Sequence, residues 1–434
     1  MSRILIAAAK QQSQGEVTLA GFVRNRRAHK GVIFVDLRDI SDAMQIVFVS
    51  GNNNYDLAEK LNLESVIEVT GVLQEKPAKK GETNSVKDYE LAVTSAKLIS
   101  LADENLPIPV LAKGDNEANL ENRLDFRWLD LRREETQLVF KVWTKLEAGA
   151  RDYFLKNNFW QIYTPCLMST ASETGSEVFE VKYFEKKAYL SQSPQFFKQM
   201  AMASGLEKVF SFGPVFRAEL SYTTRHVTEF TGWDFEVSYI SSHADLMDIE
   251  EDLLINSFQK VKTDLGLEIE IPAKPFPKIT FAEAKKKLQA AGIKSEKEFD
   301  FSTEEEKVLG EIIKKENNHD FVFVVDYPVE ARPFYHQRHE DDQKLTKSFD
   351  LLYKGLEVTT GSVREHRIEI LEKQAVEKGM NLEELKDYLN FFRYGCPNHG
   401  GIGMGPGRII MKMLNLNNIK EACFLPRDVK RLNP

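Results

Sequence analysis

The chain has 434 residues, of which 42% are hydrophobic, 29% charged and 10% aromatic. This composition excludes disordered, collagen-like and membrane-embedded proteins, and a chain of this length is expected to fold as two domains or more. The formal net charge of −8 argues against indiscriminate binding to nucleic acid, because the summed field repels phosphate.

The sequence indicates a cytoplasmic location. No run of eighteen apolar residues occurs, and the apolar stretch near the N-terminus is too short for a signal peptide. Cys166, Cys396 and Cys423 lie far apart, without the spacing of a zinc site or of a disulfide framework. We therefore expect reduced thiols and no membrane segment.

Residues 1–104 carry five segments with strand-like alternation, and a helical pattern at 55–62 follows the third. The strands are expected at 17–24, 32–38, 44–49, 66–73 and 89–100. Five strands with a helix in that position match an OB-fold barrel, which holds single-stranded nucleic acid on aromatic side chains beside a basic groove. Two basic patches suit such a groove, with a solvated surface as the alternative; they contain Arg24, Arg26, Arg27, Lys30, Lys76, Lys79 and Lys80.

Residues 105–133 are rich in Pro, Asn and charge, which indicates a linker. An amphipathic helix is expected at about 134–157, followed by strands at 178–190, 209–217, 230–240, 320–326, 348–353 and 355–360. This pattern predicts a second, α+β domain over 134–434, in which helices flank a mostly antiparallel sheet. Within it, 241–319 has helical spacing and many Lys and Glu residues, and is expected to be an inserted helical subregion.

Residues 212–237 predict a hairpin with a charged loop. Arg217 and Glu219 end its first strand, Arg225 and His226 lie in the loop, and Phe230 lies on the returning strand. A nucleoside triphosphate needs cations on its phosphates and a flat partner for its base, and these residues offer both. An ordinary charged surface hairpin is the alternative.

Two more segments carry candidate nucleotide chemistry. The glycine-rich stretch 400–416 contains Arg408 before an apolar helix, although a tight turn into a core helix explains it nearly as well. Asp350 and Glu357 fall on successive strands of a predicted hairpin, where Mg²⁺ bridging ATP phosphates would relieve their repulsion. A structural ion pair with Arg364 is the alternative there.

Together these segments resemble the three signature motifs of class II aminoacyl-tRNA synthetases, in the same order and over nearly the whole chain. FWQIYTPCLMS (159–169) resembles motif 1, FRAELSYTTRHVTEF (216–230) motif 2 and GIGMGPGRIIMKML (401–414) motif 3. The N-terminal barrel is typical of the subclass that charges aspartate, asparagine and lysine. The resemblance implies a homodimer that uses ATP and Mg²⁺ to activate an amino acid and load it onto tRNA.

Within this subclass, SQSPQFFKQM (191–200) is similar to the segment in which the lysine of aspartyl enzymes, here Lys198, meets the carboxylate of the substrate side chain. Asparaginyl enzymes usually end this segment in an acid. STASETGSEVF (169–179) resembles the mobile loop that closes over the amino acid. The resemblance implies L-aspartate as substrate, surrounded by Glu173, Gln195, Lys198, Arg217, Asp234, Thr360 and Arg364.

The resemblance also assigns the remaining roles. It implies that ATP is bound by Arg217, Glu219, Arg225, His226, Val227, Phe230, Glu357, Gly405, Pro406, Gly407 and Arg408. Catalysis would fall to Arg217, Glu357 and Arg408, and magnesium to Asp350, Glu357 and Thr360. In the barrel, Phe34 and Gln45 match positions that contact the anticodon of tRNA-Asp, with tRNA-Asn left open as a second substrate.

Some positions depart from the family pattern. Pro406 and Gly407 replace an aliphatic and an acidic residue of motif 3, so we expect a looser adenine pocket, and Thr174 and Thr360 replace glycine and serine. Three alternatives stay open. Lys198 argues against an asparaginyl enzyme, and Lys198 with Arg364 against a lysyl enzyme. The barrel argues against a paralogue that amidates a free amino acid, and the retained motif residues argue against one that only binds nucleic acid.

Overall fold

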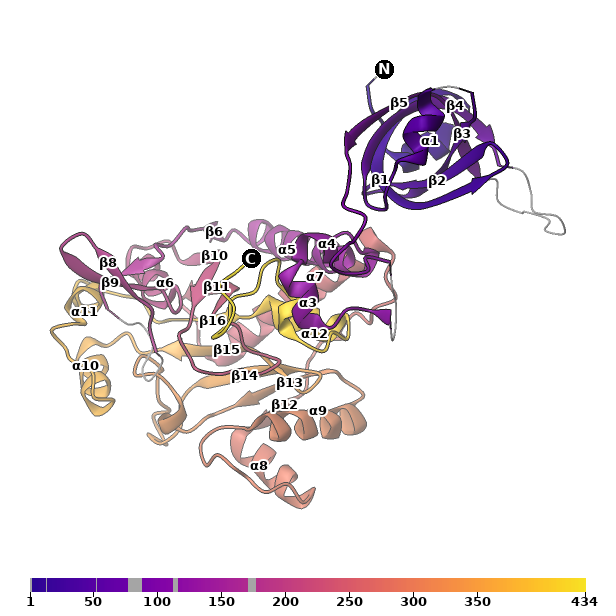
Figure 1. The fold of residues 1–434 in the computed structure, drawn as a ribbon. Coiled ribbons are helices and arrows are strands. Elements are labelled where there is room, and N and C mark those ends of the chain that lie inside the picture. The colour runs from indigo at the N-terminus through magenta and orange to yellow at the C-terminus, as the bar shows by residue number, and fades with distance from the viewer. Residues whose placement is uncertain (1, 13, 52, 77–87, 112–115, 171–176) are drawn as a thin grey trace. The chain divides into compact units, whose positions relative to one another are not determined.

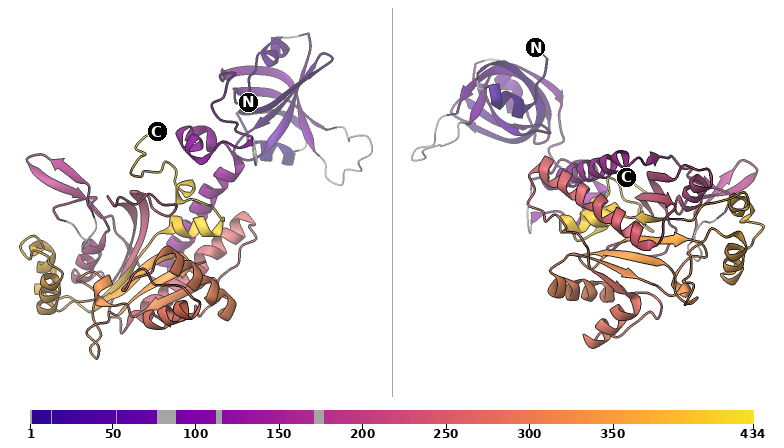
Figure 2. Two further views of the ribbon diagram at one scale, coloured as in Figure 1. Left: turned by 60° about the horizontal axis from the view of Figure 1, so that its bottom comes forward. Right: turned by 180° about the vertical axis from the view of Figure 1, so that it is seen from behind.

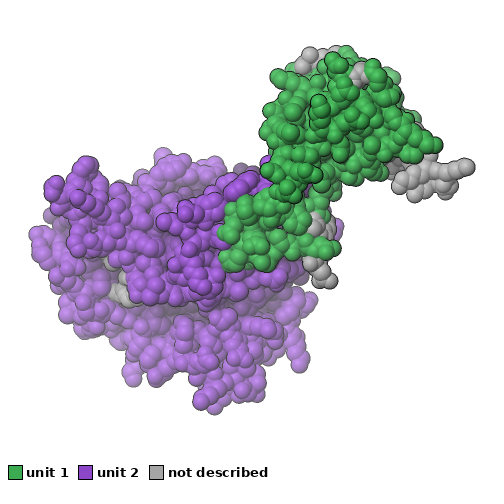
Figure 3. Space-filling model, in the orientation of Figure 1, with its two compact units in different colours: residues 1–126 green, residues 127–434 purple. Residues whose placement is uncertain are grey.

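The computed structural model describes residues 2–12, 14–51, 53–76, 88–111, 116–170 and 177–434. Lys79, Lys80, Glu173 and Thr174 lie outside the described residues. Internal contacts divide the chain into two compact units, residues 1–126 and 127–434 (Figure 3). The division falls inside the range expected for the linker, and each unit has a hydrophobic core of its own.

The first unit contains a closed barrel with strand order β1-β2-β3-β5-β4 (Figure 1). Its elements are α1 (Ile6–Gln12), β1 (Gly15–His29), β2 (Val32–Arg38), β3 (Ala43–Val49), α2 (Asn53–Glu59), β4 (Val66–Glu75), β5 (Tyr89–Ser100) and, after the barrel, α3 (Leu120–Asp125). Strands β3 and β5 pair in parallel, and the other neighbours pair antiparallel. The expected five-stranded OB-fold is confirmed.

Alternation along β2 shows why these residues close a barrel. Ile33, Val35 and Leu37 are fully buried in its core, while Phe34 and Asp36 between them are only half-buried. Successive side chains of a strand point to opposite faces, so the polar and aromatic residues fall on the outside. This outer face is where the candidate anticodon residues lie.

The second unit is built on an eight-stranded sheet of order β12-β13-β14-β15-β16-β11-β10-β6 (Figure 1). In chain order its strands are β6 (Trp160–Gln161), β10 (Lys208–Phe216), β11 (Glu229–Ser238), β12 (Lys278–Thr280), β13 (Phe321–Val325), β14 (Ser348–Tyr353), β15 (Glu357–Arg364) and β16 (His399–Met404). Only the outermost pairs, β12–β13 and β10–β6, are parallel. A small sheet beside it contains β7 (Leu167–Met168), β8 (Glu180–Tyr183) and β9 (Lys186–Leu190).

Two long helices lie side by side behind this sheet (Figure 2), α5 (Glu134–Lys156) and α7 (His243–Leu265). Gly149 lets them approach closely, because a Cβ atom there would lie 2.7 Å from the Cα atom of Ser257. A capping box of Ser242 and Asp245 begins α7. The sheet and these helices enclose the main core, which confirms the expected α+β domain of an antiparallel sheet flanked by helices.

The region expected as an insertion, 241–319, contains elements with two different packing roles. Helix α7 contributes Leu246, Leu254 and Phe258 to the main core, and β12 joins the main sheet. By contrast, α8 (Phe281–Ala290) and α9 (Thr303–Asn317) pack with β13 in a separate cluster. The charged residues of α7 do not mark it as peripheral, because its two glutamates, Glu250 and Glu251, are themselves buried.

The remaining helices surround the sheet. They are α4 (Arg127–Asp130), α6 (Gln195–Ala203), α10 (Ile368–Glu377), α11 (Lys386–Arg393), α12 (Pro406–Met413) and the 3₁₀ turns η2 (Val329–Ala331) and η3 (Ile419–Ala422). Phe196 of α6 stacks on Tyr388 of α11, with ring centroids 4.1 Å apart. No helix among the described residues is both long enough and apolar enough to cross a membrane.

The glycine-rich stretch near 400 forms a central strand, β16, before it reaches α12. Its glycines make room for the neighbouring strand: a Cβ atom at Gly401 would lie 2.0 Å from the carbonyl oxygen of Phe235 and 2.2 Å from the carboxylate of Glu236. Sequence reasoning expected a close approach of backbone to ligand here. Gly401 instead lies against the backbone carbonyl of Phe235 and the buried carboxylate of Glu236, both groups of the protein itself.

Candidate functional site

A cavity of about 770 Å³ lies in the second unit, between the ends of the central strands and the start of α12. Most of the predicted ATP and amino-acid residues line it: Gln195, Arg217, Glu219, Arg225, His226, Val227, Phe230, Asp234, Glu357, Thr360, Arg364, Gly405, Gly407 and Arg408. Its wall also contains Arg332 and Arg427, giving six arginines in all. Arginine pairs with phosphate and carboxylate through two parallel hydrogen bonds, so this wall suits an anionic ligand.

Strands β10 and β11 form the predicted hairpin and bring Arg217 onto Phe230. The guanidinium carbon lies 5.5 Å from the ring centroid, and the Arg217 amide donates to the carbonyl of Thr228 at 2.9 Å. Arg217 Nε is buried and has no hydrogen-bond partner among the described residues. Because a buried unpaired donor is costly, an anionic ligand in the cavity is a natural partner for it.

His226 is neutral in this site. Burial first, and then the charges of Arg408, Arg225 and Arg217, lower the pKa of His226 to about 4. Its Nδ1 lies 2.6 Å from Thr223 Oγ1. Sequence spacing does not reveal how many arginines surround this ring. Its place in ATP binding stays a prediction.

Arg225 is held by a residue that the sequence did not single out. Its Nη1 atom donates to both carboxylate oxygens of Glu306, each at 2.8 Å. Glu306 lies on α9, within the region expected to be a peripheral insertion. No motif or spacing signalled it, since the pair is separated by 81 residues.

The two candidate magnesium ligands differ in their surroundings. Asp350 is buried, and it accepts from Thr360 Oγ1 at 2.8 Å and pairs with Arg332 Nη2 at 2.8 Å. Glu357 lies on the cavity wall with its side chain 39% exposed, and its carboxylate is 3.6 Å from Arg408 Nη1. Arg332 was missed by sequence reasoning; it stacks over Tyr327 at 3.7 Å.

The chemistry of these carboxylates fits a metal that enters with ATP. Burial raises the pKa of Asp350, Arg332 opposes that rise, and the charge of Glu357 adds to it, so the two carboxylates repel one another. No cluster of three or more His, Cys, Asp or Glu side chains suited to a metal occurs in the part of the chain that the structure describes. Mg²⁺ bound through one or two carboxylates and substrate phosphates needs no such cluster.

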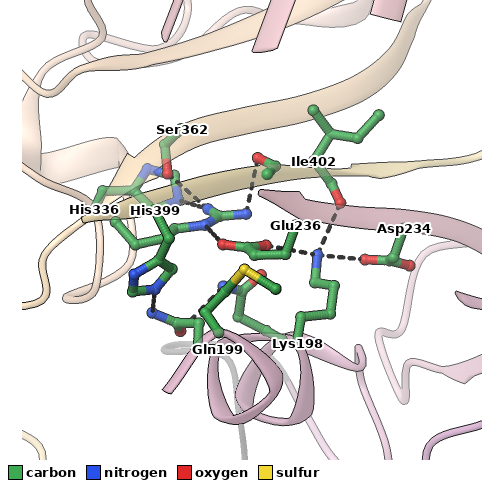
Figure 4. A network of polar contacts seen from close by, with 12 residues as sticks. Lys198, Gln199, Asp234, Glu236, His336, Ser362, His399 and Ile402 are labelled. Atoms are coloured by element: carbon green, nitrogen blue, oxygen red, sulfur yellow. Dashed lines mark hydrogen bonds and ion pairs between the residues drawn. The ribbon is translucent and has the colours of Figure 1, made fainter. Parts of the chain in front are cut away.

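Lys198 is fully enclosed at the deep side of the site (Figure 4). Its Nζ donates to Asp234 Oδ1 at 2.7 Å and to the carbonyl of Ile402 at 2.8 Å, and it lies 3.5 Å from Glu236 Oε2. The side chain is 1% exposed and does not line the cavity, whereas Asp234 does. The expected lysine is therefore close to the ligand space but shielded from it by Asp234.

Glu236 joins Lys198 to Arg364. Arg364 Nε donates to Glu236 Oε1 at 3.0 Å, and its other nitrogens donate to Ser362 Oγ at 2.6 Å and to the carbonyl of Gly401 at 2.9 Å. Burial alone would raise the pKa of Glu236, but Arg364 and Lys198 hold it below its usual value. Arg364 thus forms an ion pair with Glu236, while Asp350 forms one with Arg332. Glu236 was missed, although its position two residues after Asp234 on one strand places both on the same face.

A second set of hydrogen bonds fixes the predicted residue Gln195. Its Nε2 donates to Gln199 Oε1 at 3.1 Å, and Tyr388 donates to the same oxygen at 2.9 Å. Gln199 Nε2 lies 3.1 Å from His399 Nε2, and burial lowers the pKa of His399 to about 4, so this ring is neutral. The amide of Gln195 is thus held in place by neutral groups.

The start of α12 accounts for both departures in motif 3. Pro406 occupies the first turn, where its fixed φ and missing N–H are tolerated, and it is buried without lining the cavity. A Cβ atom at Gly407 would lie 3.3 Å from Ile419 and 3.6 Å from Trp143. These side chains fill the space beside Gly407. Arg408 then follows, and its Nη1 donates to the carbonyl of Glu357 at 2.9 Å.

In the first unit, the candidate anticodon residues lie on neighbouring strands. Phe34 on β2 is half-buried and lies opposite Arg27 of the neighbouring strand β1. Gln45 on β3 donates to Glu90 Oε2 at 2.6 Å and accepts from Arg27 Nη2 at 3.4 Å. An aromatic ring, an arginine and an amide therefore share the outer face of the barrel. Glu90, which orients Gln45, was not anticipated.

Comparison with known proteins identifies both units. Residues 119–429 match the family of class II tRNA synthetases (D, K and N), and residues 17–99 match the OB-fold nucleic acid binding domain. The aspartate–tRNA(Asp/Asn) ligase of Aeropyrum pernix is 38% identical over 99% of this chain and 98% of that protein. The aspartate–tRNA(Asp) ligase of Pyrococcus abyssi is 39% identical over 96% of each.

Solved structures agree with this assignment. Asparaginyl-tRNA synthetase from Pyrococcus horikoshii, complexed with asparaginyl-adenylate, superposes with a TM-score of 0.90 at 31% identity, and each chain is covered completely. Aspartyl-tRNA synthetase from Entamoeba histolytica gives a TM-score of 0.88 at 30% identity, covering 100% of this chain and 93% of that one. The chain belongs to the class II tRNA synthetases of the aspartate, lysine and asparagine group, and is a ligase.

Proposed function

We propose that this chain is an aspartate–tRNA ligase, which activates L-aspartate with ATP and transfers it to the 3′ end of tRNA-Asp. The observation that carries the choice of amino acid is the buried pair of cations, Lys198 and Arg364, which both contact the carboxylate of Glu236. The overall fold does not distinguish aspartate from asparagine as the substrate, because asparaginyl and aspartyl enzymes superpose on the chain almost equally well.

The charges of the network support aspartate over asparagine. Asp234 lines the cavity and offers a carboxylate to the α-ammonium of an amino acid, while Arg364 lines it as a cation. When Asp234 pairs with that ammonium, Lys198 loses one of its carboxylate partners and can bind the carboxylate of the substrate side chain. A side-chain amide would bring NH₂ donors towards cations that cannot accept them, whereas a carboxylate satisfies both.

The same charges argue against the other substrates of the family. A lysine side chain would bring a third cation towards Lys198 and Arg364, which is unfavourable in a buried site. The related proteins with 38% and 39% identity carry the names aspartate–tRNA(Asp/Asn) and aspartate–tRNA(Asp) ligase, which supports aspartate and leaves both tRNAs as candidates.

The reaction needs no protein nucleophile. The α-carboxylate of aspartate attacks the α-phosphorus of ATP, pyrophosphate leaves, and the adenosine hydroxyl at the tRNA 3′ end then attacks the mixed anhydride and releases AMP. Arg217, with its unpaired buried Nε, neutralises the charge that develops on the α-phosphate and the attacking carboxylate. Phe230 supports the adenine base, so catalysis rests on positioning and charge neutralisation.

Mg²⁺ would be held by Glu357 and Asp350, with Thr360 hydrogen-bonded to Asp350. When bound with ATP, the metal would supply charge neutralisation at the β- and γ-phosphates. The half-exposed carboxylate of Glu357 is available on the cavity wall, while Asp350 is held ready by Arg332. Arg408 contacts Glu357 and completes this side of the nucleotide site.

We also propose that two copies of the chain associate. Strand β6 ends the order of the main sheet, and apolar side chains are exposed on and around it: Leu155 is 57% exposed, Trp160 65% and Tyr163 83%. An exposed apolar edge of this kind is usually covered by a partner. Light scattering at micromolar concentration should report about twice the chain mass, and an active monomer would contradict the proposal.

Charging assays test the function as a whole. Purified enzyme is incubated with ATP, labelled aspartate and transcripts of tRNA-Asp, tRNA-Asn or tRNA-Lys. We expect aspartate to be attached to tRNA-Asp, and charging of tRNA-Asn measures how strictly the barrel reads the anticodon. Attachment of asparagine to tRNA-Asn in place of aspartate would overturn the proposal.

A further inference from the structure

Glu306 joins two parts of the ATP site from a helix outside it. The residue is 4% exposed, and its carboxylate binds Arg225 Nη1 through both oxygens at 2.8 Å. The Oε2 atom also accepts the backbone N–H of Glu357 at 3.0 Å. One buried carboxylate therefore links the loop cation of the β10–β11 hairpin to the first residue of β15.

The helix that carries Glu306 is fixed against the turn between β14 and β15. A Cβ atom at Gly310 of α9 would lie 2.5 Å from the backbone nitrogen of Gly355 in that turn. Gly355 has φ of +68°, and a Cβ atom there would lie 2.8 Å from the Cα atom of Lys307. Backbone thus rests directly on backbone, so α9 and the start of β15 keep one relative position. Glu306 is a rigid support and not a loose surface acid.

We propose that Glu306 is a positioning residue for ATP: it holds the guanidinium of Arg225 and the main chain of Glu357 in fixed relation, so that cation and carboxylate are in place before the nucleotide binds. The inference rests on the proposed function, since it assumes that Arg225 and Glu357 meet the triphosphate. Glu306 itself does not line the cavity, and it acts through these two residues.

The geometry of the Arg225–Glu306 pair indicates that Glu306 orients Arg225 for ATP and does not withhold it from ATP. Among the described residues, the side-chain hydrogen bonds of Arg225 run through Nη1 alone, and Arg225 lines the cavity. Its remaining guanidinium donors are available to a phosphate while the bond to Glu306 is kept. Without Glu306, a long arginine on a charged loop would sample many rotamers and would have to be ordered by ATP.

The test is the kinetics of aspartate-dependent pyrophosphate exchange for Glu306→Gln, which keeps the size of the side chain and offers Arg225 only one acceptor. We expect the KM for ATP to rise at least ~10-fold, with kcat changed less and the KM for aspartate unchanged. Glu304→Gln, an exposed acid on the same helix, is the matched control and should behave as wild type.

A double-mutant cycle separates positioning from general structure. If Glu306 acts through Arg225, then Glu306→Gln should have little further effect on the KM for ATP once Arg225 has been changed to alanine. Glu306→Asp, which keeps the charge but shortens the reach, should also raise this KM, and it serves as the second variant if Glu306→Gln does not fold. Thermal unfolding checks that every variant compared is native.

The outcomes are distinct. An ATP KM that stays at the wild-type value in folded Glu306→Gln and Glu306→Asp would overturn the inference. A lowered KM would also overturn it, because it would mean that Glu306 withholds Arg225 from ATP. Absence of aspartate-dependent exchange in the wild-type enzyme would instead refute the proposed function.

Discussion

Replacing Lys198 by methionine removes one charge and keeps an unbranched side chain that is one atom shorter. In the structure this ammonium is 1% exposed and compensates Asp234 at 2.7 Å and Glu236 at 3.5 Å. Glu236 keeps Arg364 as a partner at 3.0 Å, so Asp234 is the group left without a cation. Breaking one side of a buried ion pair costs ~3–5 kcal/mol. Burial already raises the pKa of Asp234, and without Lys198 it rises further, so protonation limits the loss of stability to about the lower bound.

We expect the activity of Lys198→Met to fall by more than its loss of stability alone would cause, because the substitution changes two groups of the site. Lys198→Met removes a cation from the side-chain subsite and also neutralises Asp234, the proposed partner of the substrate ammonium. We expect kcat/KM for aspartate-dependent pyrophosphate exchange to fall at least ~100-fold, which corresponds to about 2.7 kcal/mol. Asparagine should gain nothing, because the pocket still contains Arg364.

The assay compares exchange rates well below the unfolding temperature, with circular dichroism to verify folding. Lys186→Met, an exposed lysine of β9, is the matched control and should change neither stability nor exchange. A folded Lys198→Met enzyme that keeps aspartate activity within ~3-fold of wild type would refute the reasoning. It would mean that Lys198 is only a structural counter-ion for Asp234 and Glu236.

Three further changes probe other parts of the account. Glu357→Ala should abolish Mg²⁺-dependent adenylate formation while ATP binding survives, as measured by exchange and calorimetry; an unchanged magnesium optimum would contradict this. Phe34→Ala removes a stacking surface of ~1–3 kcal/mol and should weaken tRNA charging but not exchange, with Ile40→Ala on the barrel as control. Burial raises the pKa of Glu250 to about 8 from 4.5, so the folded state retains a proton that the unfolded state loses. The stabilisation from protonated Glu250 is complete below pH 4.5. As pH rises from there towards 8, the free energy of unfolding falls by roughly 1.4 kcal/mol per pH unit. Glu250→Gln should therefore be more stable than wild type at pH 8, with the advantage shrinking towards pH 4.5, and equal pH profiles would contradict the assignment.

The elements with strong local patterns could be predicted from the sequence. Alternation in 32–38 and the helical period in 134–157 reappear as β2 and α5 with nearly the same bounds, because each has one continuous apolar face. Strand β16 could not be predicted in this way. Its glycines have little strand preference, and it forms because Gly401 fits against the backbone of β11 and the Glu236 carboxylate.

Site residues could be predicted where a single sequence motif contains the side chains that line the cavity. Arg217, Phe230, Glu357 and Arg408 were named from the sequence and line one cavity. Two supporting residues were not: Glu306 meets Arg225 across 81 residues, and no spacing rule signals the pairing of Arg332 with Asp350. The same limit hid the position of Lys198 behind Asp234, which depends on how α6 packs against β11. It also hid the neutral state of His226, which depends on burial and on the arginines around the ring.

Pyrophosphate exchange on the wild-type enzyme shows which amino acid the buried cations Lys198 and Arg364 select. The rates are measured with aspartate, asparagine and lysine over matched concentration ranges, with ATP and Mg²⁺ saturating. We expect kcat/KM for aspartate to exceed that for asparagine by roughly a thousandfold or more, because an amide leaves buried cations unpaired. Exchange with asparagine as fast as with aspartate would contradict it.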